Sequence, residues 1–258
     1  MINFDYLEQN LDALRVQYLT AQPFPYLIID GFCEEEKLQK AYANVPELNN
    51  KSRDYGFAGN KFEKSNYKEI CPEFLELYND LASERFNTIL AYITAKKTFV
   101  DPKNFGGGLH QGKKNSFLDM HLDFNYHPLN KNWYRELNLL LYLNKDWKPE
   151  YGGHLKIKDL RTNEEAALEV PFNRMIIQQC APYSLHGYDM TSFPEGKYRT
   201  SIATYAYQIH EMIIEKPRTT DWFPKEDASI LKKAFAKNYN FLVKTKNKFF
   251  GSATAKNQ

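Results

Sequence analysis

Residues 117–147 read FLDMHLDFNYHPLNKNWYRELNLLLYLNKDW, and this stretch decides the fold that we predict. Its first part, FLDMHLD, places His121 and Asp123 two residues apart. Alternate side chains of a β-strand share a face, so a strand here would project these two side chains in the same direction. An imidazole beside a carboxylate on rigid backbone supplies two ligands of an open metal site. The predicted face carries Phe117, Asp119, His121 and Asp123.

Short apolar runs separated by turn residues extend from Phe99 to Tyr207 on both sides of this motif. The run 136–143 is almost wholly apolar, as expected for a central strand buried on both faces. Closely spaced short strands with turn signals indicate a sandwich or barrel of the jelly-roll kind. Further strands are expected in HLKIKDL (154–160), NRMIIQQC (173–180) and RTSIATYAY (199–207).

Helical patterns dominate the N-terminal third of the sequence. An apolar periodicity predicts one helix over 3–19 and a second over 34–45, and Pro72 suits the first turn of a helix that continues to about Ala95. The polar and aromatic segment 49–70 reads as a long loop with at most one strand, and loops of that length are often functional. A short buried strand is expected in PFPYLIIDGF (23–32).

The predicted architecture is α+β and forms a single domain over residues 1–258. Helical support occupies 1–98, the jelly-roll core 99–210, and a C-terminal helix with a tail 211–258. We expect this last helix from about Asp227 to Lys244 and a frayed tail from Gly251.

Composition excludes several classes of protein. The chain has 258 residues, of which 43% are hydrophobic, and a net charge of +2, so a globular core is expected and no nucleic-acid partner is indicated. Seven lysines follow Asp227 without an acidic residue, which is typical of a solvated helix face. The three cysteines lack metal-binding spacing and do not suggest a disulfide framework. No signal peptide or membrane span is apparent, so a cytoplasmic location is expected.

A third metal ligand must come from elsewhere in the sequence, and His186 is the best candidate. It stands in APYSLHGY, directly after the apolar run 173–180. Two histidines and one carboxylate form the facial triad of non-haem Fe(II) oxygenases, with coordination positions left open. An isolated histidine is more often a surface or core residue, and this alternative stays open. The other histidines are placed in loops (His110, His127), on the outer side of a strand (His154) and beyond the last strand (His210).

Arg199 begins the strand RTSIATYAY, thirteen residues after His186. If its face lines the interior, a guanidinium enters a largely apolar pocket, where burial without an anionic partner is costly. The planar guanidinium matches a carboxylate with two parallel hydrogen bonds. A surface or structural arginine is the alternative. The expected inward face carries Arg199, Ser201, Ala203 and Tyr205.

The ordered motifs of the sequence resemble the Fe(II)/2-oxoglutarate-dependent dioxygenases, and most closely the branch of the hypoxia-factor and collagen prolyl hydroxylases. The resemblance covers residues 105–207 and implies a double-stranded β-helix, the cupin-like jelly roll. PFPYLIIDGF also resembles the N-terminal start of bacterial members. The motifs are HLDFN (121–125), LNLLLYLNKDW (137–147), GGHLKI (152–157), PFNRMIIQ (171–178), LHGY (185–188) and KYRTSIATY (197–205).

The resemblance implies a role for each candidate residue. His121, Asp123 and His186 would bind Fe(II), with 2-oxoglutarate as co-substrate and O2 as oxidant. The far carboxylate of 2-oxoglutarate would pair with Arg199 and accept a hydrogen bond from Tyr142, although a core aromatic is the alternative for this tyrosine. In related halogenases a small residue replaces the carboxylate ligand, so Asp123 favours hydroxylation.

These motifs do not identify the substrate. Segments 49–70, 124–134 and 188–198 are expected to ring the mouth of the site, and their aromatic and amide side chains suit a prolyl or other amino-acid residue, free or in a peptide. The alternatives are hydroxylation of a small metabolite or sugar, and a catalytically silent jelly-roll protein. A structural zinc site normally has four protein ligands and often thiols, which weighs against the silent protein.

Overall fold

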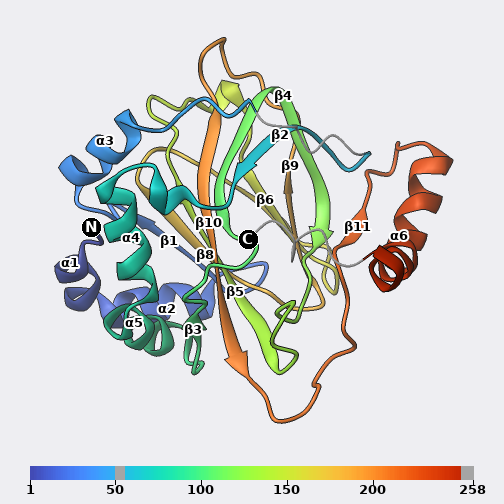
Figure 1. Ribbon diagram of the computed structural model, residues 1–258, viewed down its shortest axis with the longest axis horizontal. Coiled ribbons are helices and arrows are strands. Elements are labelled where there is room, and N and C mark those ends of the chain that lie inside the picture. The colour runs from blue at the N-terminus through green and yellow to red at the C-terminus, as the bar shows by residue number, and fades with distance from the viewer. Residues whose placement is uncertain (50–55, 251–258) are drawn as a thin grey trace.

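The core of the described part of the chain is a curled, eleven-stranded antiparallel sheet (Figure 1). Residues from several of its strands line a cavity. The computed structural model describes residues 1–49 and 56–250. The sheet order β1-β8-β5-β10-β4-β9-β6-β7 places strands distant in sequence side by side, and β2, β3 and β11 pair with its central strands. This curled sheet confirms the predicted jelly-roll core. The strands are β1 (Tyr26–Asp30), β2 (Ala58–Lys64), β3 (Phe99–Val100), β4 (Gly108–Leu122), β5 (Trp133–Tyr142), β6 (Leu155–Asp159), β7 (Glu165–Leu168), β8 (Arg174–Gln179), β9 (Ser184–Tyr188), β10 (Arg199–Ile209) and β11 (Asp221–Phe223).

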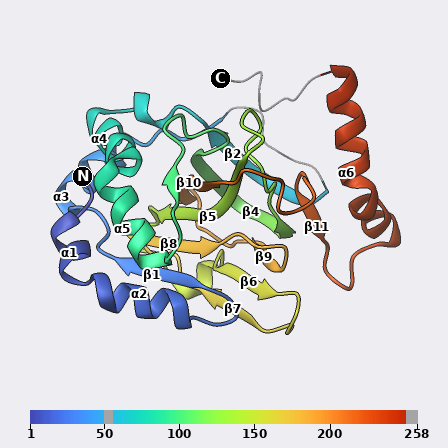
Figure 2. The same cartoon turned by 90° about the horizontal axis from the view of Figure 1, so that it is seen from below.

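The helices lie on two opposite sides of the sheet. Helices α1 to α5 gather on one side, and α6 stands apart on the other (Figures 1 and 2). No helix among the described residues is long and apolar enough to cross a membrane. The helices are α1 (Phe4–Gln9), α2 (Leu11–Thr20), α3 (Glu35–Ala43), α4 (Pro72–Ala82), α5 (Glu84–Thr94) and α6 (Ile230–Phe250), with short 3-10 turns η1 (Tyr67–Glu69) and η2 (Pro149–Tyr151).

Strand β5 separates the main hydrophobic core from the cavity. Its leucines Leu137, Leu139 and Leu141 are fully buried in a cluster with apolar side chains of α1 to α5. The alternate residues Asn138, Leu140 and Tyr142 line the cavity instead, as their spacing predicts. Burial on both faces explains why the sequence of this strand is almost continuously apolar.

Two predicted helices are each divided by a capping residue. The helix predicted from Pro72 to about Ala95 is wrong as one element, because Ser83 adopts an extended conformation (φ −69°, ψ 152°) between α4 and α5. The Ser83 hydroxyl accepts a hydrogen bond from the Phe86 amide and donates to the Asp80 carbonyl. The helix predicted over 3–19 is likewise divided, at Asn10. Serine and asparagine compete for backbone hydrogen bonds, which is why they interrupt an apolar periodicity.

Substitution of the Ser83 cap should measurably destabilise the fold. Ser83→Ala removes the acceptor for the Phe86 amide, so we expect the free energy of unfolding to fall by about 1 kcal/mol in urea denaturation. Ser83→Asn, which restores a capping oxygen, should recover most of this loss. Equal stability of Ser83→Ala and the natural protein would show that the cap does not stabilise α5.

Helix α6 is attached to the sheet through an aromatic cluster. The Phe57 ring stacks on Trp222 of β11 (centroids 4.9 Å apart) and on Phe235 of α6 (5.5 Å). The helix begins at Ile230, slightly later than predicted, and continues to Phe250. The tail predicted to fray from Gly251 lies outside the described residues, as do residues 50–55 of the predicted loop 49–70.

Candidate active site

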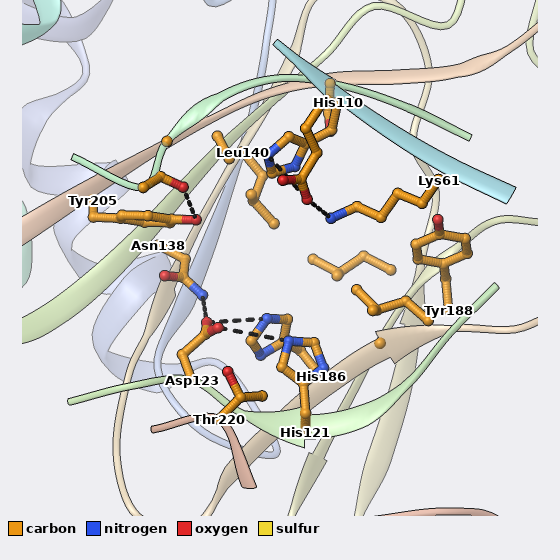
Figure 3. A pocket seen from close by; sticks show the side chains of 18 of the residues that line it. Lys61, His110, His121, Asp123, Asn138, Leu140, His186, Tyr188, Tyr205 and Thr220 are labelled. Carbon is orange, nitrogen blue, oxygen red and sulfur yellow. Dashed lines mark hydrogen bonds and ion pairs between the residues drawn. The ribbon is translucent and has the colours of Figure 1, made fainter. Parts of the chain in front are cut away.

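Three predicted metal ligands converge at one end of the cavity (Figure 3). His121 of β4 pairs directly with His186 of β9, and their ring centroids are 4.2 Å apart. Asp123 follows the last residue of β4; its Oδ1 lies 3.6 Å from His121 Nε2 and its Oδ2 lies 3.3 Å from His186 Nε2. All three ligand atoms fall within 4.8 Å of one another. The structure thus brings together the three residues that the sequence suggested.

The prediction that Phe117 and Asp119 share the face of His121 is wrong. The pairing of β4 with β9 shifts register between Leu118 and His121, as at a β-bulge. The Asp119 carboxylate instead lies 2.6 Å from Lys232 Nζ of α6, and this ammonium also lies over the Phe117 ring. A bulge inserts an unpaired residue and so changes which side chains face the same way, an effect that strict alternation misses.

The protonation states of His186 and Asp123 suit a divalent transition metal. The His121 Nδ1–H donates to the Asp119 carbonyl (2.9 Å), and its Nε2 lies toward Asp123. Burial, and secondarily the adjacent His121 ring, lower the pKa of His186 to about 3, so this imidazole is neutral. Burial alone would raise the pKa of Asp123, but the Arg135 guanidinium and the two imidazoles hold it well below its usual range. A neutral imidazole at His186 and an ionised carboxylate at Asp123 are the forms in which these two groups bind metal.

Arg135 is a site residue that sequence reasoning missed. Its side chain is 1% exposed, and its Nη2 donates to Asp123 Oδ2 (2.9 Å), which also accepts from Asn138 Nδ2 (2.8 Å). Its guanidinium lies 3.4 Å from the Tyr205 ring centroid. The pairing of β5 with β10 skips Glu136, and this bulge turns Arg135 to the cavity side together with Asn138. One sign of this role was present in the sequence: Arg135 is a charged residue near the start of a largely apolar strand.

Arg199 lies within the same cavity, as predicted. The side chain is 7% exposed; its Nε donates to the Gly153 carbonyl (2.7 Å) and its Nη2 to the Tyr142 hydroxyl (3.3 Å). No carboxylate among the described residues forms an ion pair with this guanidinium, so the buried charge suits an anionic ligand. Burial raises the pKa of Tyr142, so its hydroxyl stays protonated and is able to donate to that ligand.

Glycine is required at position 153 because the arginine passes close to its backbone. A Cβ there would lie 3.0 Å from Arg199 Cδ and 3.2 Å from its Nε, and the backbone has φ +73°. This explains the second glycine of the GGHLKI motif.

The cavity has a volume of about 250 Å³ and is lined by residues from several strands. The predicted inward face of β10 is confirmed, since Arg199, Ser201, Ala203 and Tyr205 all line the cavity. The predicted mouth segments contribute unequally. Phe124 and Tyr188 line the cavity from two of them, and the third contributes Lys61 and Glu63 of β2 and the following Ser65. Thr220 and Trp222 were not anticipated.

The remaining histidines are distinguished by their surroundings. His110 was predicted in a loop, which is wrong, because it belongs to β4 and lines the cavity. His127 is buried away from the cavity, with its Nε2 3.3 Å from Asp101 Oδ2. His154 packs edge-on against Trp147, and His210 follows the end of β10. None of these three contacts the candidate triad.

Comparison with known proteins supports the resemblance seen in the motifs. Residues 107–207 match the family described as the 2OG-Fe(II) oxygenase superfamily. None of the curated proteins matches this sequence. The resemblance to Fe(II)/2-oxoglutarate dioxygenases is therefore confirmed over the segment that carries the candidate triad and Arg199.

Solved structures with the same fold include prolyl hydroxylases. One, from Trichoplax adhaerens in complex with a hypoxia inducible factor peptide fragment, is 13% identical with a TM-score of 0.55, over 79% of this protein and 91% of that one. A prolyl-4-hydroxylase from Pseudomonas putida is 16% identical with a TM-score of 0.52, over 78% and 99%. HygX from Streptomyces hygroscopicus, with nickel, 2-oxoglutarate and hygromycin B bound, is 14% identical with a TM-score of 0.50, over 72% and 84%.

Proposed function

We propose that this protein is an oxygenase that uses Fe(II), 2-oxoglutarate and O2 to hydroxylate a C–H bond of its substrate, in keeping with the match of residues 107–207 to the 2OG-Fe(II) oxygenase superfamily. One observation carries the proposal: a triad of two imidazoles and a carboxylate shares a single cavity with a buried arginine that has no carboxylate partner in the described residues. Fe(II) bound there would use O2 to convert 2-oxoglutarate to succinate and CO2 and supply the oxidant for the substrate.

Each protein group has a defined task in this proposal. His121, Asp123 and His186 would hold Fe(II), since their ligand atoms lie within 4.8 Å of one another. Arg135 and Asn138 keep Asp123 ionised and fix its orientation, as partners of metal ligands commonly do. The apolar and aromatic parts of the cavity wall limit water around the reacting atoms.

At the co-substrate end, Arg199 and Tyr142 would fix the far carboxylate of 2-oxoglutarate. The guanidinium supplies the counter-charge, and the protonated hydroxyl supplies a further donor. These contacts orient the co-substrate relative to the triad before the substrate reacts.

The substrate that we favour is a prolyl or other amino-acid residue, free or in a peptide. Support comes from the prolyl hydroxylases that share this fold, one of which was solved with a peptide. A small metabolite or sugar is the second candidate, because HygX holds hygromycin B on the same fold. A silent zinc-binding protein fits poorly, since within residues 1–49 and 56–250 no fourth ligand joins the triad.

The proposal is tested by anaerobic addition of Fe(II) and 2-oxoglutarate to the purified protein. A weak visible charge-transfer band should develop, and admission of air should then yield succinate. If neither the band nor succinate is observed, the protein is not an oxygenase of this kind.

Removal of the Arg199 guanidinium should weaken co-substrate binding selectively. Arg199→Met eliminates the charge-assisted hydrogen bonds to the carboxylate, so we expect the Kd for 2-oxoglutarate to rise about tenfold or more. The Kd for Fe(II) should not change, because Arg199 does not contact the triad. Isothermal titration with each ligand distinguishes the two effects, and a parallel loss of iron affinity would contradict the assigned role.

A further inference from the structure

A second charged cluster faces the cavity from the side opposite the triad (Figure 3). We name Lys61, Glu63 and His110 the charged wall. Lys61 Nζ lies 2.7 Å from Glu63 Oε1, and His110 Nε2 lies 3.9 Å from the same oxygen. The three side chains are only 14 to 20% exposed, so most of their surface is withdrawn from bulk solvent.

Strand pairing explains why these groups meet. Lys61 and Glu63 are two residues apart on β2, so they project from the same face of the strand. Glu63 is the direct cross-strand partner of His110, and Lys61 is the partner of Gly112, which also lines the cavity. The charged wall is therefore fixed on rigid paired backbone.

The proposed chemistry leaves the charged wall without a task. The triad holds the metal, and Arg199 supplies the counter-charge for 2-oxoglutarate. A partly buried ion pair contributes little net stability because desolvation opposes its attraction. Two charges directed into an active-site cavity are accordingly best explained as a binding surface for the substrate.

The charge pattern selects a particular kind of ligand. Within the charged wall, Lys61 and Glu63 present one cation and one carboxylate close together. A ligand with only a carboxylate is repelled by Glu63, and a ligand with only an amine is repelled by Lys61. A zwitterion with adjacent ammonium and carboxylate groups offers a charged partner to both, whereas the amides of a peptide offer only uncharged hydrogen bonds.

The volume of the cavity limits the part of the substrate that enters it. About 250 Å³ must accommodate the co-substrate as well as the reacting part of the substrate. The space left beside 2-oxoglutarate suits a reacting group of a few carbon atoms, such as an amino-acid side chain.

We propose that the charged wall binds the α-ammonium and α-carboxylate groups of a free amino acid and directs its side chain toward the triad. Lys61 donates to the carboxylate, and Glu63 accepts from the ammonium group. The proposal rests on the oxygenase function above: a C–H bond of the bound amino acid, O2 and 2-oxoglutarate become a C–OH group, succinate and CO2. β2 lies outside the family match at 107–207, so this subsite is a feature of this protein beyond the matched core.

The test compares free amino acids with their capped forms. The 258-residue protein, loaded with Fe(II) and 2-oxoglutarate in air, is given each proteinogenic L-amino acid and, separately, its N-acetyl amide. At least one free amino acid should raise succinate release above the rate without substrate and gain one oxygen atom by mass spectrometry. Its capped form should not.

Three variants test whether the charged wall binds the active amino acid. With the active amino acid, Lys61→Met and Glu63→Gln should each raise its KM about tenfold or more, the effect expected for a lost charge-assisted hydrogen bond. The KM for 2-oxoglutarate should not change. Lys64→Met is the matched control, because it removes a lysine of the same strand that does not line the cavity. Thermal melts by circular dichroism verify that all variants fold.

The outcomes separate this proposal from the proposed function. If capped amino acids react as well as free ones, the substrate is peptidyl and the zwitterion subsite is refuted. If 2-oxoglutarate is slowly converted without substrate but no amino acid accelerates it, the subsite is refuted while the oxygenase function stands. If 2-oxoglutarate is neither bound nor converted, both proposals fail.

Discussion

Replacement of His121 with alanine should remove Fe(II) binding and succinate formation together. His121 supplies one of three ligand atoms that lie within 4.8 Å of one another, and two ligands cannot hold the metal by a face. Loss of a residue that merely supports a ligand weakens metal binding by about 10–100-fold, so loss of a ligand should cost more than about a hundredfold. Anaerobic Fe(II) titration and the visible band with 2-oxoglutarate measure the effect.

His154→Ala is the matched control for this experiment. It also removes one imidazole, but His154 packs against Trp147 and does not line the cavity. Iron affinity and succinate formation should stay at the natural level. If His121→Ala retained iron affinity while folded by circular dichroism, the metal centre would have to lie elsewhere.

Replacement of Arg135 with methionine should produce the largest loss of stability. The guanidinium is 1% exposed and is bonded to the ionised Asp123, whose side chain is 16% exposed. Breaking a buried ion pair leaves one charge uncompensated, and we expect the free energy of unfolding of the metal-free protein to fall by about 3 kcal/mol. Urea denaturation at neutral pH measures this change.

Arg174→Met provides the comparison for the stability measurement. Arg174 also pairs with an aspartate, but Asp30 is 66% exposed, so its loss should cost less than about 1 kcal/mol. Equal losses in the two variants would mean that the Arg135–Asp123 pair contributes no more than a surface ion pair. Weakened Fe(II) binding in Arg135→Met would further support its role in orienting Asp123.

The proposed substrate subsite uses an element that lies outside the matched core. The triad and Arg199 lie within 107–207, whereas Lys61, Glu63 and Trp222 come from β2 and β11 outside it. One fold hosts sites for quite different molecules, as the prolyl hydroxylases and the hygromycin-bound HygX illustrate. Substitutions in β2 should therefore alter substrate preference before they alter the reaction.

The sequence patterns predicted the features that the regular geometry of a single strand determines. Alternation with period two correctly placed Asn138, Leu140 and Tyr142 on the cavity face of β5, and Arg199 with Tyr205 on that of β10. These predictions succeeded because the pleat of a regular strand fixes the direction of each side chain. The spacing of His121, Asp123 and His186 likewise carried enough information to propose a metal centre.

Tertiary structure alone decided where that regularity fails and which distant strands meet. The bulge at Glu136 turned Arg135 toward Asp123, and the register shift after Leu118 turned Asp119 away from His121. The pairing of β2 with β4 brought Glu63 beside His110, although the two residues are far apart in the sequence. A local pattern specifies the face of a strand, but the partner strand and the position of a bulge are set by packing of the whole sheet. The sequence alone therefore predicted the metal centre and the jelly-roll core, whereas only the fold revealed what holds Asp123 in place and which charged residues line the cavity opposite the triad.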